Sequence, residues 1–235
     1  TLAVSANEAL GGVASSGTML IGGRLELRNV NYSTVEALDL EGGQITSQIG
    51  ESIWAGDWNV HANSTLNLAV DTRVTLNGNL TGNRGITQLG EGIMVLAGEA
   101  DPQTTGGWDN GNRFYSVNAG TLILDYSTNT NSKLADQARL TLGGSRRGGT
   151  LRLVGGSQEE IVGATTIGAG ENAIYRDSGT SIIRLNAVSR QAGATLYFDE
   201  PSIAKVDNLN VNGILGAWAV VRDPVQGDLD WAKNQ

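Results

Sequence analysis

A short unit recurs along this chain and limits the folds that it can adopt. The unit is a turn of glycine or small polar residues, followed by two aliphatic residues separated by one position. One copy reads Gly22-Gly23-Arg24-Leu25-Glu26-Leu27. Others read N-S-T-L-N-L from Asn63, A-G-T-L-I-L from Ala119, G-G-T-L-R-L from Gly148 and G-A-T-L-Y-F from Gly193. Alternation with period two places both aliphatic side chains on one face of a strand. The unit predicts half-buried strands of about four to six residues.

Helical signals are nearly absent, because the 33 glycines interrupt almost every window long enough for a helix. Short strands at uneven intervals are compatible with a sandwich, a barrel or a β-solenoid. Only 5% of the residues are aromatic, and the recurring unit supplies Leu, Ile and Val for burial. Uniform aliphatic ladders are typical of stacked coils. We therefore predict an all-β chain folded as a right-handed parallel β-helix (β-solenoid), with a β-sandwich as the alternative.

The chain organisation follows from this unit. With roughly 20 to 25 residues per coil, the chain makes about ten coils. We expect residues 1–235 to form a single β-solenoid domain and to be a fragment of a longer repeat protein, since the first residue is Thr1. Residues 101–114 are longer and more polar than the usual turn, and residues 157–176 lack a full copy of the unit. We expect both to project from the rod as loops.

Composition excludes several classes of function. The chain has no Cys and one His, so neither a disulfide scaffold nor a thiolate metal site can form. It carries 16 Lys+Arg against 24 Asp+Glu, and this acidic balance argues against nucleic acid as a partner. No stretch approaches the roughly 20 apolar residues that cross a bilayer, so we expect no membrane insertion by this segment. No motif for a cofactor or for calcium is present.

A resemblance to a known family adds to this reading. The segment G-E-G-I-M-V-L-A-G from Gly90, followed by V-N-A-G-T-L-I-L from Val117, resembles the autotransporter-associated β-strand repeat. The pieces N-E-A-L-G from Asn7, S-G-T-M-L from Ser16 and G-I-L-G-A-W-A from Gly213 are similar to other elements of such proteins. The resemblance implies a right-handed parallel β-helix, export, and a place in a long extracellular protein. It implies no catalytic residues.

Candidate catalytic residues are few. His61 would have to serve any Ser-His-Asp triad, yet the chain has no G-x-S-x-G nucleophile motif, so a surface histidine is the favoured interpretation. Asp125, Asp136 and Asp177 are dispersed, and Glu159-Glu160 form a local pair. Parallel β-helices carry many polysaccharide lyases and hydrolases, which need converging carboxylates. Solvated outward positions explain these carboxylates better, and we expect no catalytic and no metal-binding residue.

The aromatic residues are the other candidates. Trp54 and Trp58 are four positions apart, Trp108 lies within the long polar stretch, and Tyr115 follows it. Exposed rings in a groove can stack on sugars, so these four residues are speculative glycan contacts. For Trp54 and Trp58 the favoured alternative is burial, since large apolar rings usually pack into a core.

The expected function is a non-enzymatic structural or adhesive β-helical module of a large bacterial cell-surface or secreted protein, located outside the cell. Its partners would be neighbouring repeats or copies of itself, and surface glycans. Two alternatives stay open. One is a carbohydrate-binding or carbohydrate-degrading β-helix, tailspike-like or lyase-like. The other is a subunit of an extracellular filament or a virion tail.

Overall fold

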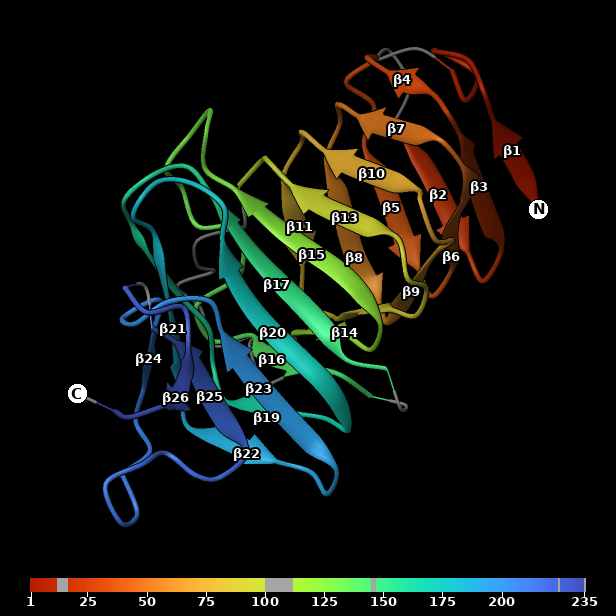
Figure 1. The fold of residues 1–235 in the computed structure, drawn as a ribbon. Helices are drawn as coiled ribbons and strands as arrows, with labels where there is room; N and C mark the ends of the chain where they lie inside the picture. Colours follow the sequence, from red (N-terminus) through yellow and green to blue (C-terminus); the bar gives the residue numbers. More distant parts are fainter. Residues whose placement is uncertain (12–16, 100–111, 145–146, 224, 235) are drawn as a thin grey trace.

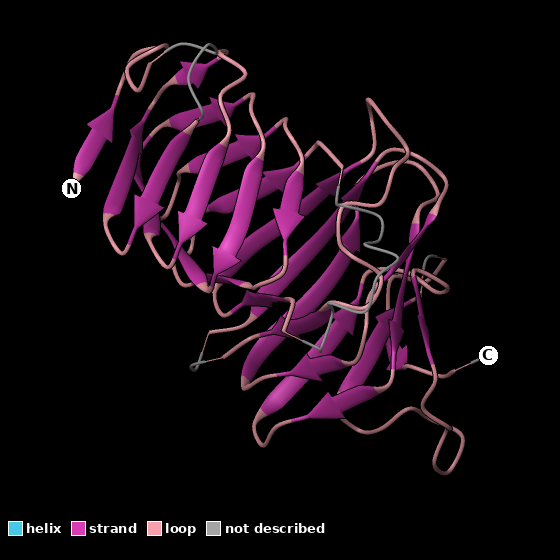
Figure 2. Ribbon diagram, turned by 180° about the vertical axis from the view of Figure 1, so that it is seen from behind, coloured by secondary structure: helices cyan, strands magenta, loops and turns pink. Residues whose placement is uncertain are grey.

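The computed structural model describes residues 1–11, 17–99, 112–144, 147–223 and 225–234. In these residues the chain contains strands and no helix, and it winds into a parallel β-solenoid of about nine turns (Figure 1). Seen from behind, the strands lie side by side from the N-terminal to the C-terminal end of the molecule (Figure 2). The predicted all-β solenoid is confirmed, and the sandwich alternative is wrong.

Sheet A forms one side of the solenoid, and all of its strands are parallel. In spatial order it contains β1 (Leu2–Val4), β3 (Arg24–Arg28), β6 (Gln44–Ile49), β9 (Ser64–Leu68), β12 (Ile86–Gln88), β14 (Phe114–Val117), β16 (Arg139–Leu142), β19 (Thr165–Ile167) and β22 (Val188–Arg190).

Sheet C forms the second side, and it is parallel except at its C-terminal edge. Its order is β4 (Asn31–Tyr32), β7 (Glu51–Trp54), β10 (Arg73–Leu76), β13 (Ile93–Leu96), β15 (Gly120–Asp125), β17 (Gly149–Val154), β20 (Gly170–Arg176), β23 (Ala194–Phe198), β25 (Ala219–Arg222) and β26 (Leu229–Trp231). The last pair, β25 and β26, is antiparallel.

The third side consists of two smaller sheets. Sheet B contains β2 (Thr18–Ile21), β5 (Leu38–Glu41), β8 (Trp58–Ala62) and β11 (Leu80–Gly82). Sheet D contains β18 (Glu159–Ile161), β21 (Ile182–Asn186) and β24 (Ala204–Val206). Between these two sheets, the described residues of the third side form no strand.

Register explains why the recurring unit folds this way. Leu25 pairs with Ile45, which pairs with Leu66, so one inward position per coil builds a continuous aliphatic ladder. Leu122 pairs with Leu151 in the same manner on sheet C. These side chains are buried in one core cluster that runs through the solenoid. Removing a fully buried aliphatic side chain from water stabilises the fold by about 1.5–3 kcal/mol, and each coil repeats that contribution.

The expected loop at residues 157–176 is wrong, because this segment forms part of three coil sides. It contains β18, β19 and the whole of β20. The recurring unit is absent because the inward positions are partly polar: Glu160 and Thr165 are buried where the unit would place aliphatic residues. Of the other expected loop, residues 101–111 lie outside the described residues, and Phe114 begins β14.

Glycine recurs at the corner that leads from sheet C to the third side. A Cβ atom added to Gly56 would lie 1.9 Å from the carbonyl oxygen of Glu36 in the preceding coil. One at Gly78 would lie 2.0 Å from the carbonyl oxygen of Gly56, and one at Gly98 would lie 1.9 Å from that of Gly78. Successive coils therefore approach so closely at this corner that any side chain would push them apart.

Each end of the solenoid carries a short covering segment. At the N-terminal end, the side-chain oxygen of Asn7 accepts hydrogen bonds from Thr34, and Leu10 packs against the core. At the C-terminal end, the antiparallel β26 places Ala232 in the core beside Ala219. These contacts cover part of the apolar interior that the last coils would otherwise expose.

Candidate functional site

Two of the predicted glycan contacts lie inside the solenoid. Trp54 and Trp58 are both fully buried, so neither ring presents a face to a ligand. They do not share one strand: Trp54 ends β7 and Trp58 begins β8, on either side of a corner. The Trp54 ring stacks on Tyr32 at 4.4 Å between centroids, and its indole N–H donates to the carbonyl of Glu36. The predicted role of these two residues is wrong, and core packing is their function.

Tyr115 also fails as an outward contact. It pairs with Ile86 on one side and with the fully buried Leu140 on the other, and these positions face the interior. Its ring packs against the core and lines a small cavity. The fourth predicted contact, Trp108, lies outside the described residues.

Within the described residues, the best-defined interior cavity is too small for a substrate. The cavity lined by Leu66, Met94, Tyr115 and Leu122 has about 30 Å³ of free space, and its lining is almost entirely apolar. A single water needs roughly 10–15 Å³ and several polar partners. This cavity is therefore a packing defect among three successive coils.

A buried carboxylate organises the third side where no strand is present. Glu160 accepts hydrogen bonds from the Tyr126 hydroxyl at 2.5 Å, from the backbone N–H of Lys133 at 3.0 Å and from that of Leu134 at 2.8 Å. Burial raises the pKa of Glu160 above its ordinary value, although these three donors act in the opposite direction. Burial and the neighbouring Glu160 also raise the pKa of Tyr126. The network fixes residues 126–134 to the coil that follows.

Lys133 is held in the same region by oxygen atoms. Its ammonium donates to the carbonyl oxygens of Ala97 and Gly98, at 3.1 and 2.7 Å, and to the side-chain oxygen of Asn129 at 2.6 Å. The side chain is almost completely buried, and burial lowers the pKa of Lys133. A buried ammonium with several acceptors is satisfied, so Lys133 joins this segment to the preceding coil.

Glu36 is a second buried carboxylate, near the N-terminal end of the solenoid. Its carboxylate accepts from the Thr18 hydroxyl and the Tyr32 hydroxyl, both at 2.5 Å. Burial, followed by the hydrogen bond to Glu36, raises the pKa of Tyr32 to about 12. Like Glu160, Glu36 is buried and fully engaged, so neither carboxylate is open to a substrate.

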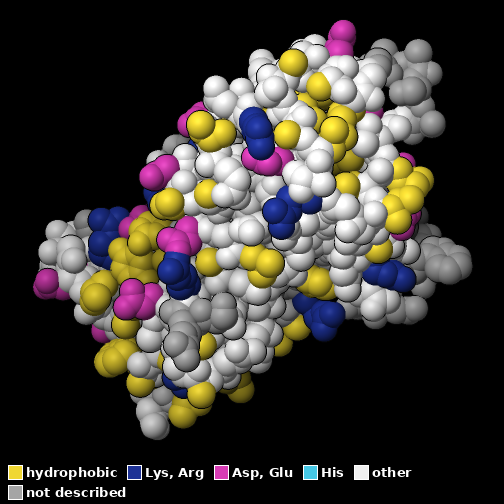
Figure 3. All heavy atoms as spheres, turned by 90° about the vertical axis from the view of Figure 1, so that its right-hand side faces the viewer, with side chains coloured by type: hydrophobic (Ala, Val, Ile, Leu, Met, Phe, Trp, Pro, Cys, Tyr) yellow, Lys and Arg dark blue, Asp and Glu magenta, His cyan; other side chains and the backbone are white. Residues whose placement is uncertain are grey.

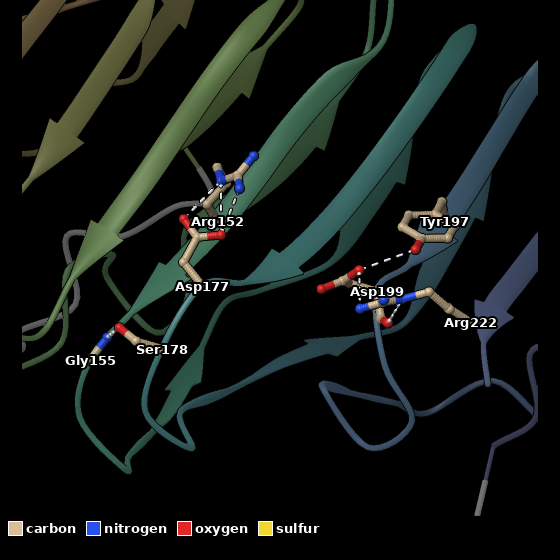
Figure 4. A network of polar contacts seen from close by, with 7 residues as sticks. All are labelled: Arg152, Gly155, Asp177, Ser178, Tyr197, Asp199 and Arg222. Atoms are coloured by element: carbon tan, nitrogen blue, oxygen red, sulfur yellow. Dashed lines mark hydrogen bonds and ion pairs between the residues drawn. The ribbon is translucent and has the colours of Figure 1, made fainter. Parts of the chain in front are cut away.

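Ion pairs cross the outer surface of the C-terminal coils and join one coil to the next. Asp177 receives two guanidinium nitrogens of Arg152, and Asp199 receives Arg222 at 2.9 Å and the Tyr197 hydroxyl at 3.1 Å (Figure 4). The Arg152 guanidinium also lies over the ring of Tyr175, 4.9 Å from its centroid. The partners of each pair lie about one coil apart in sequence.

Glu159 lies between two cations, Arg184 and Lys205, which belong to the next two strands of sheet D. The hydrogen bond from Lys205 lowers the pKa of Glu159, and that from Arg184 acts in the same direction. A general acid at neutral pH needs a raised pKa and an open site. Glu159 has neither property, so its arrangement is that of a brace between coils.

The remaining candidate catalytic residues, Asp125, Asp136 and His61, do not converge on one site. Asp125 accepts from the backbone N–H of Ser127 within a turn, and burial raises the pKa of the half-buried Asp136. His61 Nε2 lies 3.7 Å from a carboxylate oxygen of Asp39 on the outer face of sheet B. Within the described residues, no group of three or more His, Cys, Asp or Glu side chains could hold a metal ion.

The outer face of sheet A carries a feature that the sequence pattern did not identify. One outward position is occupied by a hydroxyl side chain in six successive coils, in the order Thr65, Thr87, Ser116, Thr141, Thr166 and Ser189. We call these six residues the hydroxyl column. The sequence does show a threonine at an outward position in single strands such as S-T-L-N-L and R-L-T-L. That these hydroxyl residues form one row becomes clear only from the register between coils.

No family model, no curated protein and no solved structure matches this chain. Among the described residues, no helix is long and apolar enough to cross a membrane.

Proposed function

We propose that this chain is a non-enzymatic structural and adhesive module of a large bacterial cell-surface or secreted protein. The observation that carries the proposal is the use of the charged side chains. Asp177, Asp199 and Glu159 each face a cation from a neighbouring coil, and Glu36 and Glu160 are buried in hydrogen-bond networks. These carboxylates brace the solenoid, and none of them is paired with a second free carboxylate in a groove.

The construction of the rod supports a mechanical role. Parallel strands satisfy their backbone hydrogen bonds from coil to coil, and the aliphatic ladders extend through the interior. The interior cavity that the described residues line is too small for a ligand. A repeat protein of this kind presents long, regular outer faces, which is the geometry that a spacer or an adhesive surface requires. The net charge of −8 disfavours non-specific association with acidic cell surfaces.

Surface labelling of the source bacterium tests the location. Antibodies raised against the purified chain should label intact cells, or the culture medium should contain the antigen. Antibodies against a cytosolic protein serve as the control and should label only permeabilised cells. Labelling by both antibodies only after permeabilisation would contradict the proposal.

A further inference from the structure

The hydroxyl column is a regular outward feature that spans six coils. Neighbouring coils in a parallel sheet are about 4.8 Å apart, so the six side chains form a straight row of hydroxyl groups along the rod. The row at the alternating positions of sheet C contains Thr75, Val95, Ile123, Arg152 and Tyr175. Val95 and Ile123 are buried, and the five side chains share no common chemistry. The outward row of sheet A therefore carries the same functional group in six coils, whereas the row on sheet C carries a different side chain in each coil.

Several hydroxyls of the column are available to a ligand. Among the described residues, the hydroxyls of Thr65, Thr87 and Thr141 have no hydrogen-bond partner, and each of the three side chains is partly exposed. Ser116 donates to the side-chain oxygen of Asn118 at 2.7 Å, and Thr166 and Ser189 bond to each other at 3.1 Å. A threonine hydroxyl both donates and accepts, as a sugar hydroxyl does.

An aromatic ring lies beside the middle of the column. Phe114 points outward from β14, two residues before Ser116, and it is partly exposed. Three consecutive atoms of its ring lie 2.3–2.5 Å from the point where a Cβ atom of Gly85 would be. Such equal distances place one face of the ring on the backbone of Gly85, so the other face points away from the sheet. An outward ring face suits stacking on the apolar face of a sugar.

The surroundings of the column are mostly uncharged. The neighbouring outward positions include Asn67, Leu89 and Asn118, and Phe114 pairs with Arg139 on the next strand. The side of the molecule on which β3, β6 and β9 lie is largely covered by uncharged polar side chains and backbone, with charged side chains scattered over it (Figure 3). Because the whole chain is acidic, a polyanion would be repelled.

We propose that the outer face of sheet A binds an extended, neutral polysaccharide that runs along the hydroxyl column. The row is one-dimensional, so it suits an extended linear chain lying along the rod. Hydroxyl groups of successive sugars bond to the column, and one sugar stacks on Phe114. This inference rests on the adhesive part of the proposed function and specifies its ligand.

The test is retention of the purified full chain on amorphous cellulose and on chitin, with polygalacturonate as the anionic comparison. Wild type should be retained on at least one neutral polymer and not on polygalacturonate. The double variant Thr87→Val with Thr141→Val keeps side-chain shape and removes two free hydroxyls, so its affinity should be about tenfold weaker. Phe114→Leu should weaken binding to a similar extent.

The matched control is Thr75→Val with Thr150→Val, the same pair of changes on the outer face of sheet C. It should bind as wild type does, and circular dichroism should show that all variants are folded. The inference is overturned if wild type is retained on neither neutral polymer, if it is retained only on polygalacturonate, or if both double variants bind equally. None of these outcomes alters the result of surface labelling, so failure of this inference is distinguishable from failure of the proposed function.

Discussion

At the residue scale, the side chains that hold this solenoid together include polar groups that are buried as deeply as the leucines. Glu160 is fully buried and accepts three hydrogen bonds, and Lys133 fills a cluster of carbonyl oxygens. If the Glu160 side chain were removed, its three hydrogen-bond donors would be left without an acceptor in the dry interior, and this would destabilise the fold. These residues therefore hold in place the part of the third side that forms no strand, residues 126–134.

The raised pKa of Glu160 predicts a specific pH dependence. The folded carboxyl binds its proton more tightly than it does in the unfolded chain, where the pKa is near 4.5. Its contribution to stability is complete below that value and is lost as the pH rises through the raised pKa of the folded state. The free energy of unfolding of wild type, measured by urea denaturation relative to Glu160→Gln, should increase as the pH falls from neutrality towards 4.5.

The control for this measurement is Glu171→Gln, which changes an exposed carboxylate on β20. The difference between wild type and this control should depend on pH less than the difference between wild type and Glu160→Gln. A stability difference at Glu160 that decreases towards acidic pH would show that the hydrogen bonds outweigh burial.

The side on which a single residue lies was the hardest property to predict from sequence. Phe114 and Tyr115 are adjacent, so one of them must face the core and the other solvent. The sequence drew attention to Tyr115 as a contact, whereas register places it beside Leu140 and directs Phe114 outward. Burial is the favoured expectation for Trp54 and Trp58, because their size makes exposure costly, and the structure confirms it.

At the element scale, the recurring turn and L-x-L unit was sufficient to predict strands and a solenoid. Gly22 to Leu27 and Gly148 to Leu153 fold as the alternation indicates. Residues 157–176 were missed because their inward positions include Glu160 and Thr165, whose partners come from other coils. A pattern within one strand carries no information about hydrogen bonds that another coil supplies.

The corner glycines give a prediction about coil spacing. Gly78→Ala places a methyl group about 2.0 Å from the carbonyl oxygen of Gly56, so neighbouring coils must separate. We expect a loss of about 1–3 kcal/mol in the free energy of unfolding, the usual cost of overpacking. Gly23→Ala is the matched control, since its methyl group would meet Leu20 at an ordinary 3.5 Å. Equal stability of the two variants in thermal denaturation would contradict the close approach at this corner.

At the scale of the whole molecule, the described strands contact mainly those of the coils next to them in the stack. A partly exposed ion pair such as that between Arg222 and Asp199 contributes about 1 kcal/mol or less. Each ion pair between coils therefore contributes less to stability than a buried side chain of the aliphatic ladders does. The two ends differ from the middle, because the outer edges of β1 and β26 have no neighbouring strand among the described residues.

This difference predicts a gradient of local stability along the rod. Backbone amides of β1, β2 and β26 should exchange hydrogen with solvent fastest, and those of the central strands β13, β15 and β17 slowest. Hydrogen exchange followed by mass spectrometry of peptides measures this directly. Uniform exchange along the chain would indicate that the molecule opens as one unit and would contradict an account based on neighbouring coils.

We propose that the carboxylates of this solenoid brace its coils and carry out no catalysis. Incubation of the chain with a broad panel of polysaccharides, scored for new chain ends, tests this proposal. We expect no new chain ends on any polymer, whether or not the protein is retained. New chain ends that disappear when a single Asp or Glu is replaced by its amide would contradict the proposal.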